Sequence, residues 1–368
     1  MRRFIVLACA MALGVSLSST YAGAAFASAR PAASPDWLIV VSPGQSIQAA
    51  VNRARPGFTI LIKPGVYRQS VQIRTSGITL LGSGNSRRGT VLKPPRHVVD
   101  STCNRAFGPT GVCILARKVN LRTGKVAKAV RNVTVRGLLV KGFQGNGVFG
   151  FGTNGLAVTH VTAVRDGGYG ISRFVSTRTL FADDVAIGNH EAGFYVGDSP
   201  DADAVVRDNI ARGNALGIFI RHARKVAVFG NLATRNCQGI LVLDDGQKGG
   251  AGNAVIKHNL VTRNNKFCPA NKEGPKFQGG GILLLGATKT LVAHNRVTGN
   301  RGTQFNSGGI VVLSARQLTH GSNPKNDRIA RNSVHRNRPF DLFWDGTGVN
   351  VSFVRNRCGT SSPAGLCR

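Results

Sequence analysis

The chain repeats itself with a period of roughly 22–24 residues over much of its length, and this period restricts the possible fold more than any other feature. Each repeat has a glycine followed by alternating apolar residues, as in G-I-F-I-R-H-A at Gly217. The repeat glycines are Gly170, Gly193, Gly217, Gly239, Gly281 and Gly309. The first four are almost evenly spaced, whereas the wider intervals before Gly281 and Gly309 indicate inserted loops. The run D-L-F-W-D-G-T at Asp341 looks like one more copy.

Two further columns of residues recur with the glycines, and both consist mainly of asparagine. The first column contains Asn209, Asn231, Asn259, Asn295, Asn332 and Asn356. The second contains Asp166, Asn189, Asn214, Asn236, Asn264, Asn300 and Asn337. Asparagine tolerates left-handed backbone geometry in a turn, and its amide can hydrogen-bond a neighbouring repeat. The two columns therefore predict structural ladders rather than chemistry.

Short runs rich in Val, Ile, Leu, Phe and Thr alternate between inward and outward positions, which predicts strands rather than helices. One repeat is too thin to bury its own apolar face, so the repeats must stack to form a continuous core. The first and third residues after each glycine then face that core. Arg173 occupies one of these core positions, and we expect a local bulge that turns Phe174 inward in its place.

On these motifs the chain resembles the right-handed parallel β-helix proteins of the pectate-lyase-like superfamily. Residues 42–73 carry the same resemblance, because in that family such a stretch forms an amphipathic capping helix and the first coil. Ile47, Ala50, Val51 and Ala54 are spaced for one helix face, which suits a plug over the open end of the stack.

The resemblance implies an all-β fold, a right-handed parallel β-helix of about 22–24 residues per coil with a short N-terminal capping helix. It covers roughly residues 40–357. It is specific for the fold and weak for function, because the same fold hosts lyases, hydrolases, epimerases, phage adhesins and non-catalytic binders.

Residues 1–29 have the pattern of a secretory signal peptide, with Met1-Arg2-Arg3 followed by an apolar run and small residues. We expect cleavage after Ala24 or Ala29 and a secreted, extracellular protein. No later segment reaches about 18 consecutive apolar residues, so no transmembrane anchor is expected once the signal is removed. The expected organisation is a linker at 30–40, a β-helix domain at 41–357 and a disulfide-closed tail at 358–368, in a monomer.

Six cysteines remain after removal of the signal peptide, and an even number in an exported chain suggests disulfides. Six cysteines allow 15 connectivities, which the sequence alone does not resolve. Proximity along the chain favours Cys103–Cys113, Cys237–Cys268 and Cys358–Cys367. No C-x-x-C pair is present, which disfavours a metal site built from cysteines.

The chain is strongly basic, with 48 Lys and Arg against 16 Asp and Glu. Such a charge predicts attraction to polyanions, of which an anionic polysaccharide or cell-wall polymer is the expected partner; solubility alone is the other explanation. Nucleic acid is not expected, because no recognised motif is present and the protein is exported. Yet ten acids gather in one part of the chain: Asp166, Asp183, Asp184, Glu191, Asp198, Asp201, Asp203, Asp208, Asp244 and Asp245.

The second residue after each repeat glycine should face outward, yet this column is largely apolar. It contains Ser172, Tyr195, Phe219, Leu241, Leu283, Val311 and Phe343. Either inserted loops cover it, above all residues 246–280, or Tyr195 and Phe219 form a platform on which sugar rings stack.

The fifth residue after the glycine gives a candidate site, because Asp198, His222 and Asp244 stand there in three successive repeats. Such a stack would raise the pKa of the imidazole and orient its ring. The adjacent positions add Arg221 and Asp245, and His190 and Glu191 lie one turn away, where they are candidates for substrate binding together with Phe219. The site as a whole could also be no more than a set of turn residues.

This arrangement suits proton abstraction at C5 of a uronate polymer, leading to β-elimination or epimerisation. We expect His222 to be the base and Tyr195 a proton donor. The substrate carboxylate would be neutralised by Arg221 or by a Ca²⁺ ion held by Asp198, Asp244 and Asp245. No other cofactor is indicated.

Two alternatives remain open. Paired aspartates also permit glycoside hydrolysis, although only Asp183-Asp184 and Asp244-Asp245 match the usual signature of polygalacturonase-like relatives. The D-P-H-[DE] run of alginate epimerases is absent. The second alternative is a non-catalytic β-helix that binds an anionic polymer or a cell-surface partner. The gathered acids favour an enzyme, because they would oppose a polyanion that is merely bound.

Overall fold

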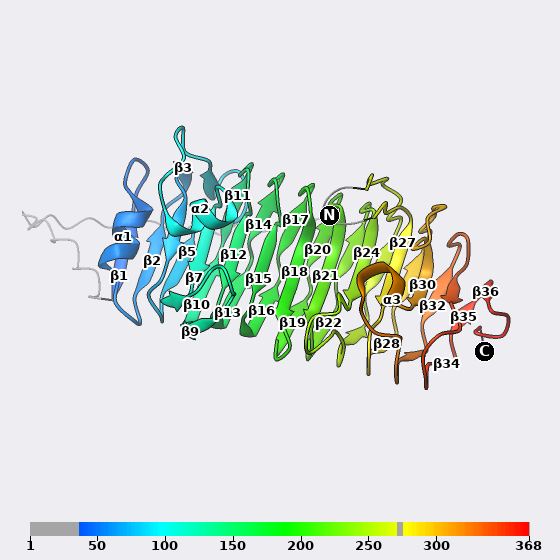
Figure 1. The fold of residues 1–368 in the computed structure, drawn as a ribbon. Coiled ribbons are helices and arrows are strands. Elements are labelled where there is room, and N and C mark those ends of the chain that lie inside the picture. The colour runs from blue at the N-terminus through cyan, green and yellow to red at the C-terminus, as the bar shows by residue number, and fades with distance from the viewer. Residues whose placement is uncertain (1–36, 271–274, 368) are drawn as a thin grey trace, which may run out of the picture. The chain divides into compact units, whose positions relative to one another are not determined.

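A computed structural model describes residues 37–270 and 275–367 of the chain, and the expected signal peptide lies outside these residues. From Asp36 onward the chain forms one compact unit in which successive coils stack along a common axis (Figure 1). Each typical coil adds one strand to each of three parallel sheets, named here sheets A, B and C. The expected all-β fold with parallel stacking is confirmed.

Sheet A has 12 strands, all paired in parallel. They are β1 (Leu38–Val41), β2 (Thr59–Ile62), β5 (Thr79–Gly82), β10 (Val130–Arg136), β13 (Thr153–Thr159), β16 (Thr177–Ala182), β19 (Ala204–Arg207), β22 (Val226–Phe229), β25 (Val255–Lys257), β28 (Leu291–Ala293), β31 (Arg328–Ala330) and β34 (Ser352–Val354). The first of these strands begins inside the segment expected to be a linker, so the stack begins before residue 41.

Sheet B follows sheet A in each coil and has 11 strands. They are β3 (Gly65–Arg68), β6 (Thr90–Lys93), β11 (Leu138–Lys141), β14 (Thr162–Val164), β17 (Val185–Ile187), β20 (Ile210–Arg212), β23 (Leu232–Thr234), β26 (Leu260–Thr262), β29 (Arg296–Thr298), β32 (Ser333–His335) and β35 (Arg357–Cys358). Most of these strands are very short, because one turn precedes and another follows each of them.

Sheet C completes each coil and also has 11 strands. They are β4 (Val71–Ile73), β7 (Val112–Leu115), β12 (Val148–Phe151), β15 (Ile171–Phe174), β18 (Ala192–Ser199), β21 (Leu216–Ala223), β24 (Gln238–Leu243), β27 (Gly280–Leu285), β30 (Gly308–Leu313), β33 (Leu342–Trp344) and β36 (Ser361–Ser362). The repeat glycines stand at the starts of its strands. The last strand shows that the C-terminal tail continues the stack.

The remaining elements lie in the connections. They are a two-stranded antiparallel ribbon of β8 (Lys118–Val119) and β9 (Val126–Lys128), and the helices α1 (Ile47–Arg53), α2 (Thr102–Phe107) and α3 (Arg316–Thr319). Helix α1 begins at Ser46, whose side chain accepts a hydrogen bond from the backbone of Ala49. Its apolar face is buried as expected, with Ala54 buried just beyond its end. It caps the first coils.

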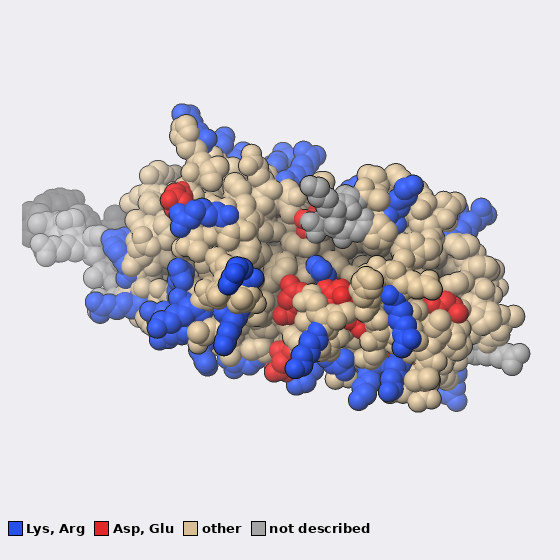
Figure 2. Space-filling view, in the orientation of Figure 1, with Lys and Arg blue, Asp and Glu red and all other residues tan. Residues whose placement is uncertain are grey.

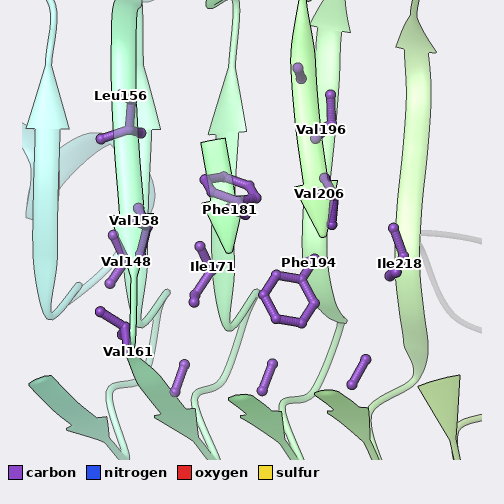
Figure 3. Packing of buried hydrophobic residues seen from close by; sticks show 14 of the residues in the cluster. Val148, Leu156, Val158, Val161, Ile171, Phe181, Phe194, Val196, Val206 and Ile218 are labelled. Atoms are coloured by element: carbon purple, nitrogen blue, oxygen red, sulfur yellow. The ribbon is translucent and has the colours of Figure 1, made fainter. Parts of the chain in front are cut away.

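The core consists of columns of apolar side chains that point into the coils (Figure 3). Ile171, Phe194, Ile218, Ile240, Ile282 and Ile310 pair in register and are at most 1% exposed. The first position after each repeat glycine is therefore a core position, as expected. Burial of this continuous column stabilises the stack, since no single coil could enclose it.

The bulge expected at Arg173 is wrong. Arg173 pairs with Val196 without a register shift and is fully buried. Its guanidinium donates hydrogen bonds to the carbonyls of Ser176 and Ala202 and to the hydroxyl of Ser199. Burial lowers its pKa to about 9. These acceptors offset the free-energy cost of burying the charged guanidinium. The alternation of apolar residues in the sequence does not predict such a buried arginine.

Both asparagine ladders are confirmed. In the first, the amide of Asn231 donates to the side chain of Asn259 at 2.9 Å and to the carbonyl of Val206 at 2.9 Å. The same pattern continues through Asn295, Asn332 and Asn356. The second ladder repeats it from Asn189 to Asn337. The side chains thus satisfy turn amides and carbonyls that the strands leave unpaired.

Two of the gathered acids begin these ladders. Asp184 accepts a hydrogen bond from the backbone of Val161, and Asp166 accepts one from Phe143. Burial raises the pKa of Asp166 to about 8 and raises that of Asp184 well above its ordinary value. These carboxyl groups are therefore structural, while Asp183 next to them is exposed in a left-handed turn.

The three disulfides pair as expected: Cys103–Cys113, Cys237–Cys268 and Cys358–Cys367. The second one joins the residue before β24 to the inserted loop that follows β26. It therefore fixes that loop against the outer face of sheet C.

We predict that Asp166→Asn stabilises the protein at pH 8 and has little effect near pH 4. The carboxyl group has a pKa of about 8 in the folded chain and of about 3.9 in the unfolded chain. Its contribution to stability is therefore present below pH ~4 and is lost as the pH rises through about 8. Asparagine fills the same ladder position in later coils and does not titrate.

Melting temperatures of the wild type and Asp166→Asn between pH 4 and pH 8 check this prediction. The difference should widen steadily with pH, whereas Asp201→Asn, at an exposed ion pair, should show no such trend. A difference that stays constant with pH would contradict the assignment.

Candidate functional site

The outer face of sheet C carries a cleft of about 310 Å³, called here the sheet C cleft. Its polar lining consists of Tyr169, His190, Glu191, Arg221, Asp245 and Thr319. Phe219 and Leu243 provide apolar walls, and Cys268, Pro269, Pro275 and Phe277 belong to the loop beside it. Figure 2 shows acidic side chains gathered in the middle of this face, with Lys and Arg around them.

The parallel register brings these residues together. Tyr195, Phe219 and Leu241 pair across β18, β21 and β24 on the outward side. Arg221 lies two positions beyond Phe219 on the same side. The sequence positions 190, 221 and 245, although far apart along the chain, thus meet on three neighbouring coils.

The outward apolar column forms a second core beneath an inserted loop, which is the first of the two alternatives expected from the sequence. Tyr195 and Leu283 are fully buried, and Phe277 of the inserted loop packs against the cluster. The backbones of Cys268 and Phe277 exchange two hydrogen bonds, of 2.9 and 3.0 Å, and the disulfide to Cys237 anchors this hairpin. Tyr195 therefore offers no exposed platform for a sugar, whereas Phe219, 9% exposed, borders the cleft.

Arg221 and Asp245 form the central ion pair of the cleft. The Nε atom of Arg221 lies 2.9 Å from Oδ2 of Asp245, which also accepts a hydrogen bond from the side chain of Gln247 at 2.6 Å. Burial lowers the pKa of Arg221, but Tyr195, Asp245 and Asp198 more than offset this effect and hold it above its ordinary value.

A tyrosine and a glutamate form the other side of the cleft. Burial raises the pKa of Tyr169 well above its ordinary value, and the nearby Tyr195 and Glu191 raise it further. The rings of Tyr169 and Tyr195 lie 4.5 Å apart. His190 is exposed next to this pair, so the two residues expected to bind substrate, His190 and Glu191, do line the cleft.

His222 is close to Asp198 but is not part of the cleft lining. Its Nδ1 atom lies 3.9 Å from Oδ1 of Asp198, and its Nε2 atom lies 2.8 Å from the carbonyl oxygen of Lys248. The residue is only 6% exposed. A base must reach its substrate directly or through one water molecule, and His222, which does not line the cleft and whose Nε2 atom contacts a backbone carbonyl, is poorly placed for that role.

Asp198 is not one of the residues that line the cleft, but Arg221 and Asp245 act on it electrostatically, and it keeps 29% of its side chain exposed, against 8% for His222. Burial raises its pKa above the ordinary aspartate value, and Asp245 raises it further, while Arg221 and His222 act in the opposite direction. A carboxyl group with a raised pKa next to a carboxylate is the usual arrangement of a general acid and its partner.

Asp244 turns away from the cleft and serves as a structural anchor. Its two carboxylate oxygens accept hydrogen bonds from the backbones of Gly246, at 3.0 Å, and Ser322, at 2.9 Å. Its carbonyl oxygen accepts one from the hydroxyl of Thr319. The expected stack of Asp198, His222 and Asp244 therefore extends only from Asp198 to His222.

The three aspartates considered for calcium do not converge. Asp244 is occupied by backbone amides and Asp245 by Arg221 and Gln247. Within residues 37–270 and 275–367, no group of three or more His, Cys, Asp or Glu side chains could hold a metal ion.

No helix in the described part of the chain is long and apolar enough to cross a membrane.

Two lining residues were not expected from the sequence. Tyr169 immediately precedes the repeat glycine Gly170, at a position where the repeats share no residue type, so no column draws attention to it. Thr319 lies in α3, in the connection that follows the repeat at Gly309, and hydrogen bonds to Asp244 hold this segment at the cleft. No local sequence signal indicates this contact.

Comparisons with known proteins show the same fold. The family model described as a right-handed beta helix region matches residues 117–248. The A-module of the mannuronan C-5 epimerase AlgE6 from Azotobacter vinelandii superposes with a TM-score of 0.60 at 17% identity, covering 86% of this chain and 89% of that chain.

Two other solved structures have a TM-score of 0.53. They are a DFA-IIIase from Arthrobacter chlorophenolicus A6 in complex with GF2, at 11% identity, and the catalytic domain of a GH87 alpha-1,3-glucanase in complex with tetrasaccharides, at 15% identity. The alignments cover 88% of this chain and 93% of the first protein, and 90% of this chain and 67% of the second. No curated protein sequence matches the chain significantly. The likeness establishes a right-handed parallel β-helix.

We predict that Asp244→Ala destabilises the protein by about 1–3 kcal/mol, because it removes a buried carboxylate that accepts hydrogen bonds from two backbone amides. Urea unfolding of the variant measures this loss. Asp201→Ala, at an exposed pair with Lys225, serves as a control and should change stability by less than about 0.5 kcal/mol. Equal stability of both variants would contradict the anchoring role.

Proposed function

We propose that this right-handed parallel β-helix protein is an exported, polysaccharide-active enzyme and that the sheet C cleft is its active site. The observation that carries this proposal is the Arg221–Asp245 ion pair, which stands in a cleft together with Glu191, Tyr169 and His190. On a chain with three times as many basic as acidic residues, such a gathering of acids has no value for holding a polyanion. It does have value for acid–base chemistry.

The reaction that best suits these groups is hydrolysis of a glycosidic bond. Asp198, whose pKa is raised, would protonate the leaving oxygen. Asp245, which pairs with Arg221 and lines the cleft, would activate water or attack the anomeric carbon. Phe219 would pack against the apolar face of a sugar ring, and Glu191 with His190 would hydrogen-bond its hydroxyl groups.

Proton abstraction at C5 of a uronate, leading to elimination or epimerisation, is the second candidate. It is favoured by the closeness of Arg221 to the phenols of Tyr169 and Tyr195, since a cation there could neutralise a substrate carboxylate. It is weakened by the position of His222 outside the cleft lining and by Asp245, which already pairs with the arginine. A non-catalytic binding role remains the third candidate.

Products released from a panel of uronate and neutral polysaccharides test these candidates. New reducing ends without ultraviolet absorbance identify hydrolysis, an unsaturated product identifies elimination, and a changed sugar composition identifies epimerisation. We predict hydrolysis, with Asp245→Asn and Asp198→Asn each lowering kcat by about 10²–10⁴-fold.

His222→Gln is the matched control and should retain activity within about tenfold, because its side chain is nearly buried and its Nε2 atom contacts the carbonyl oxygen of Lys248. Loss of activity in His222→Gln together with an unsaturated product would support the second candidate instead. If no polysaccharide yields any product, the proposal of an enzyme is wrong.

The pH profile gives an independent check. A general acid works only while protonated, so activity should fall as the pH rises through the raised pKa of Asp198. Arg221 lowers that pKa, so Arg221→Gln should move the alkaline limb of kcat to higher pH. An alkaline limb that stays in place or moves to lower pH would exclude Asp198 as the acid.

A further inference from the structure

A second surface, on sheet B, is distinct from the cleft. Three adjoining depressions run along the outer side of β20, β23, β26, β29 and β32 and share lining residues where they meet. The first depression shares the lining residues Thr262, Arg263, Arg296 and Thr298 with the second. The second shares Arg296 and Arg336 with the third. We call this continuous surface the sheet B groove.

Arginine dominates the charge of the groove. Its lining includes Arg212, Arg235, Arg263, Arg296, Arg301 and Arg336, all of them exposed. None of the six forms an ion pair with a described residue, although ion pairs occur elsewhere in the structure, as between Arg207 and Asp208. Asp341, at one end, is buried and accepts hydrogen bonds from Asn337, Gly359 and Thr360. Among the described residues, no carboxylate thus pairs with these arginines.

The groove is periodic because the coils are in register. Thr234, Thr262 and Thr298 pair across successive strands and form a row of hydroxyl groups. Arg235, Arg263 and Arg336 each occupy a left-handed turn position directly after a sheet B strand, so they recur at the same edge of the groove. Neighbouring coils are about 4.8 Å apart, which sets the spacing of charges and hydroxyls along the axis.

This pattern fits one class of ligand. A linear polymer with a negative charge on each unit and hydroxyl groups between them matches a row of arginines beside a row of threonines. Single-stranded nucleic acid is bound largely by stacking on aromatic rings, and no Phe, Tyr or Trp side chain lines the groove among the described residues.

We propose that the sheet B groove binds an anionic polysaccharide, with its carboxylate groups on the arginines and its chain parallel to the axis of the stack. This proposal goes beyond the proposed function, on which it rests for the class of polymer. The groove would hold a polymer near the protein while another part of the same polymer, or a second polymer molecule, enters the sheet C cleft. It would give a role to the arginines of the groove that form no ion pair with a described residue.

Direct binding tests this proposal without reference to activity. We compare long polygalacturonate with a neutral glucan and with oligothymidylate at several salt concentrations, using the wild type and the triple variant Arg235→Gln, Arg263→Gln, Arg296→Gln. We expect the variant to bind polygalacturonate about tenfold or more weakly, and its slope of log affinity against log salt to fall by about two to three. The neutral glucan should not bind the groove.

A matched variant controls for net charge. Arg87→Gln, Arg88→Gln, Arg122→Gln removes three exposed arginines from the N-terminal coils and should leave affinity within about threefold. Melting temperatures confirm that both variants fold. Equal loss in both variants, or no loss in either, would overturn the proposal. Tighter binding of oligothymidylate than of polygalacturonate, lost in the groove variant, would replace the polysaccharide with a nucleic acid.

Discussion

The in-register stacking of coils is the constraint on which the rest of the structure depends, and the two asparagine ladders fix that register at the turns. Each amide donates to the next ladder side chain and to a backbone carbonyl, as Asn236 does to Asn264 and Ala211. A slip of one residue would break every such contact and would turn the core column outward. Everything described for the cleft and the groove follows from this register, because it alone brings distant residues onto neighbouring coils.

The ladders also explain part of the charge distribution. Asp166 and Asp184 belong to ladder positions, and Asp244 anchors a loop through backbone amides. This leaves a smaller set, centred on Asp198 and Asp245, that faces Arg221 and is available for chemistry. The ten gathered acids therefore have different tasks, and only a few of them concern the cleft.

The fold could be predicted from the sequence because the repeat glycines, the alternating apolar residues and the asparagine columns all indicate the same register of the coils. The sequence also predicted the disulfides, since each pair closes a short local loop. It was not sufficient at Arg173, where three buried acceptors decide the outcome, nor at Asp244, where a loop much later in the chain supplies the partner. In the candidate site, His190, Glu191, Phe219, Arg221 and Asp245 were expected and do gather. Tyr169 and Thr319 depend on contacts that no local pattern encodes.

The position of a bound oligosaccharide tests the central claim most directly, because the account separates an acidic cleft for chemistry from a basic groove for binding. This position can be determined from a crystal structure of the Asp245→Asn variant with a bound oligosaccharide. The oligosaccharide would be taken from the polymer that the wild type degrades. The account predicts a sugar ring against Phe219 in the sheet C cleft, within hydrogen-bond distance of Arg221 and Glu191. A saccharide bound only outside the cleft would contradict it.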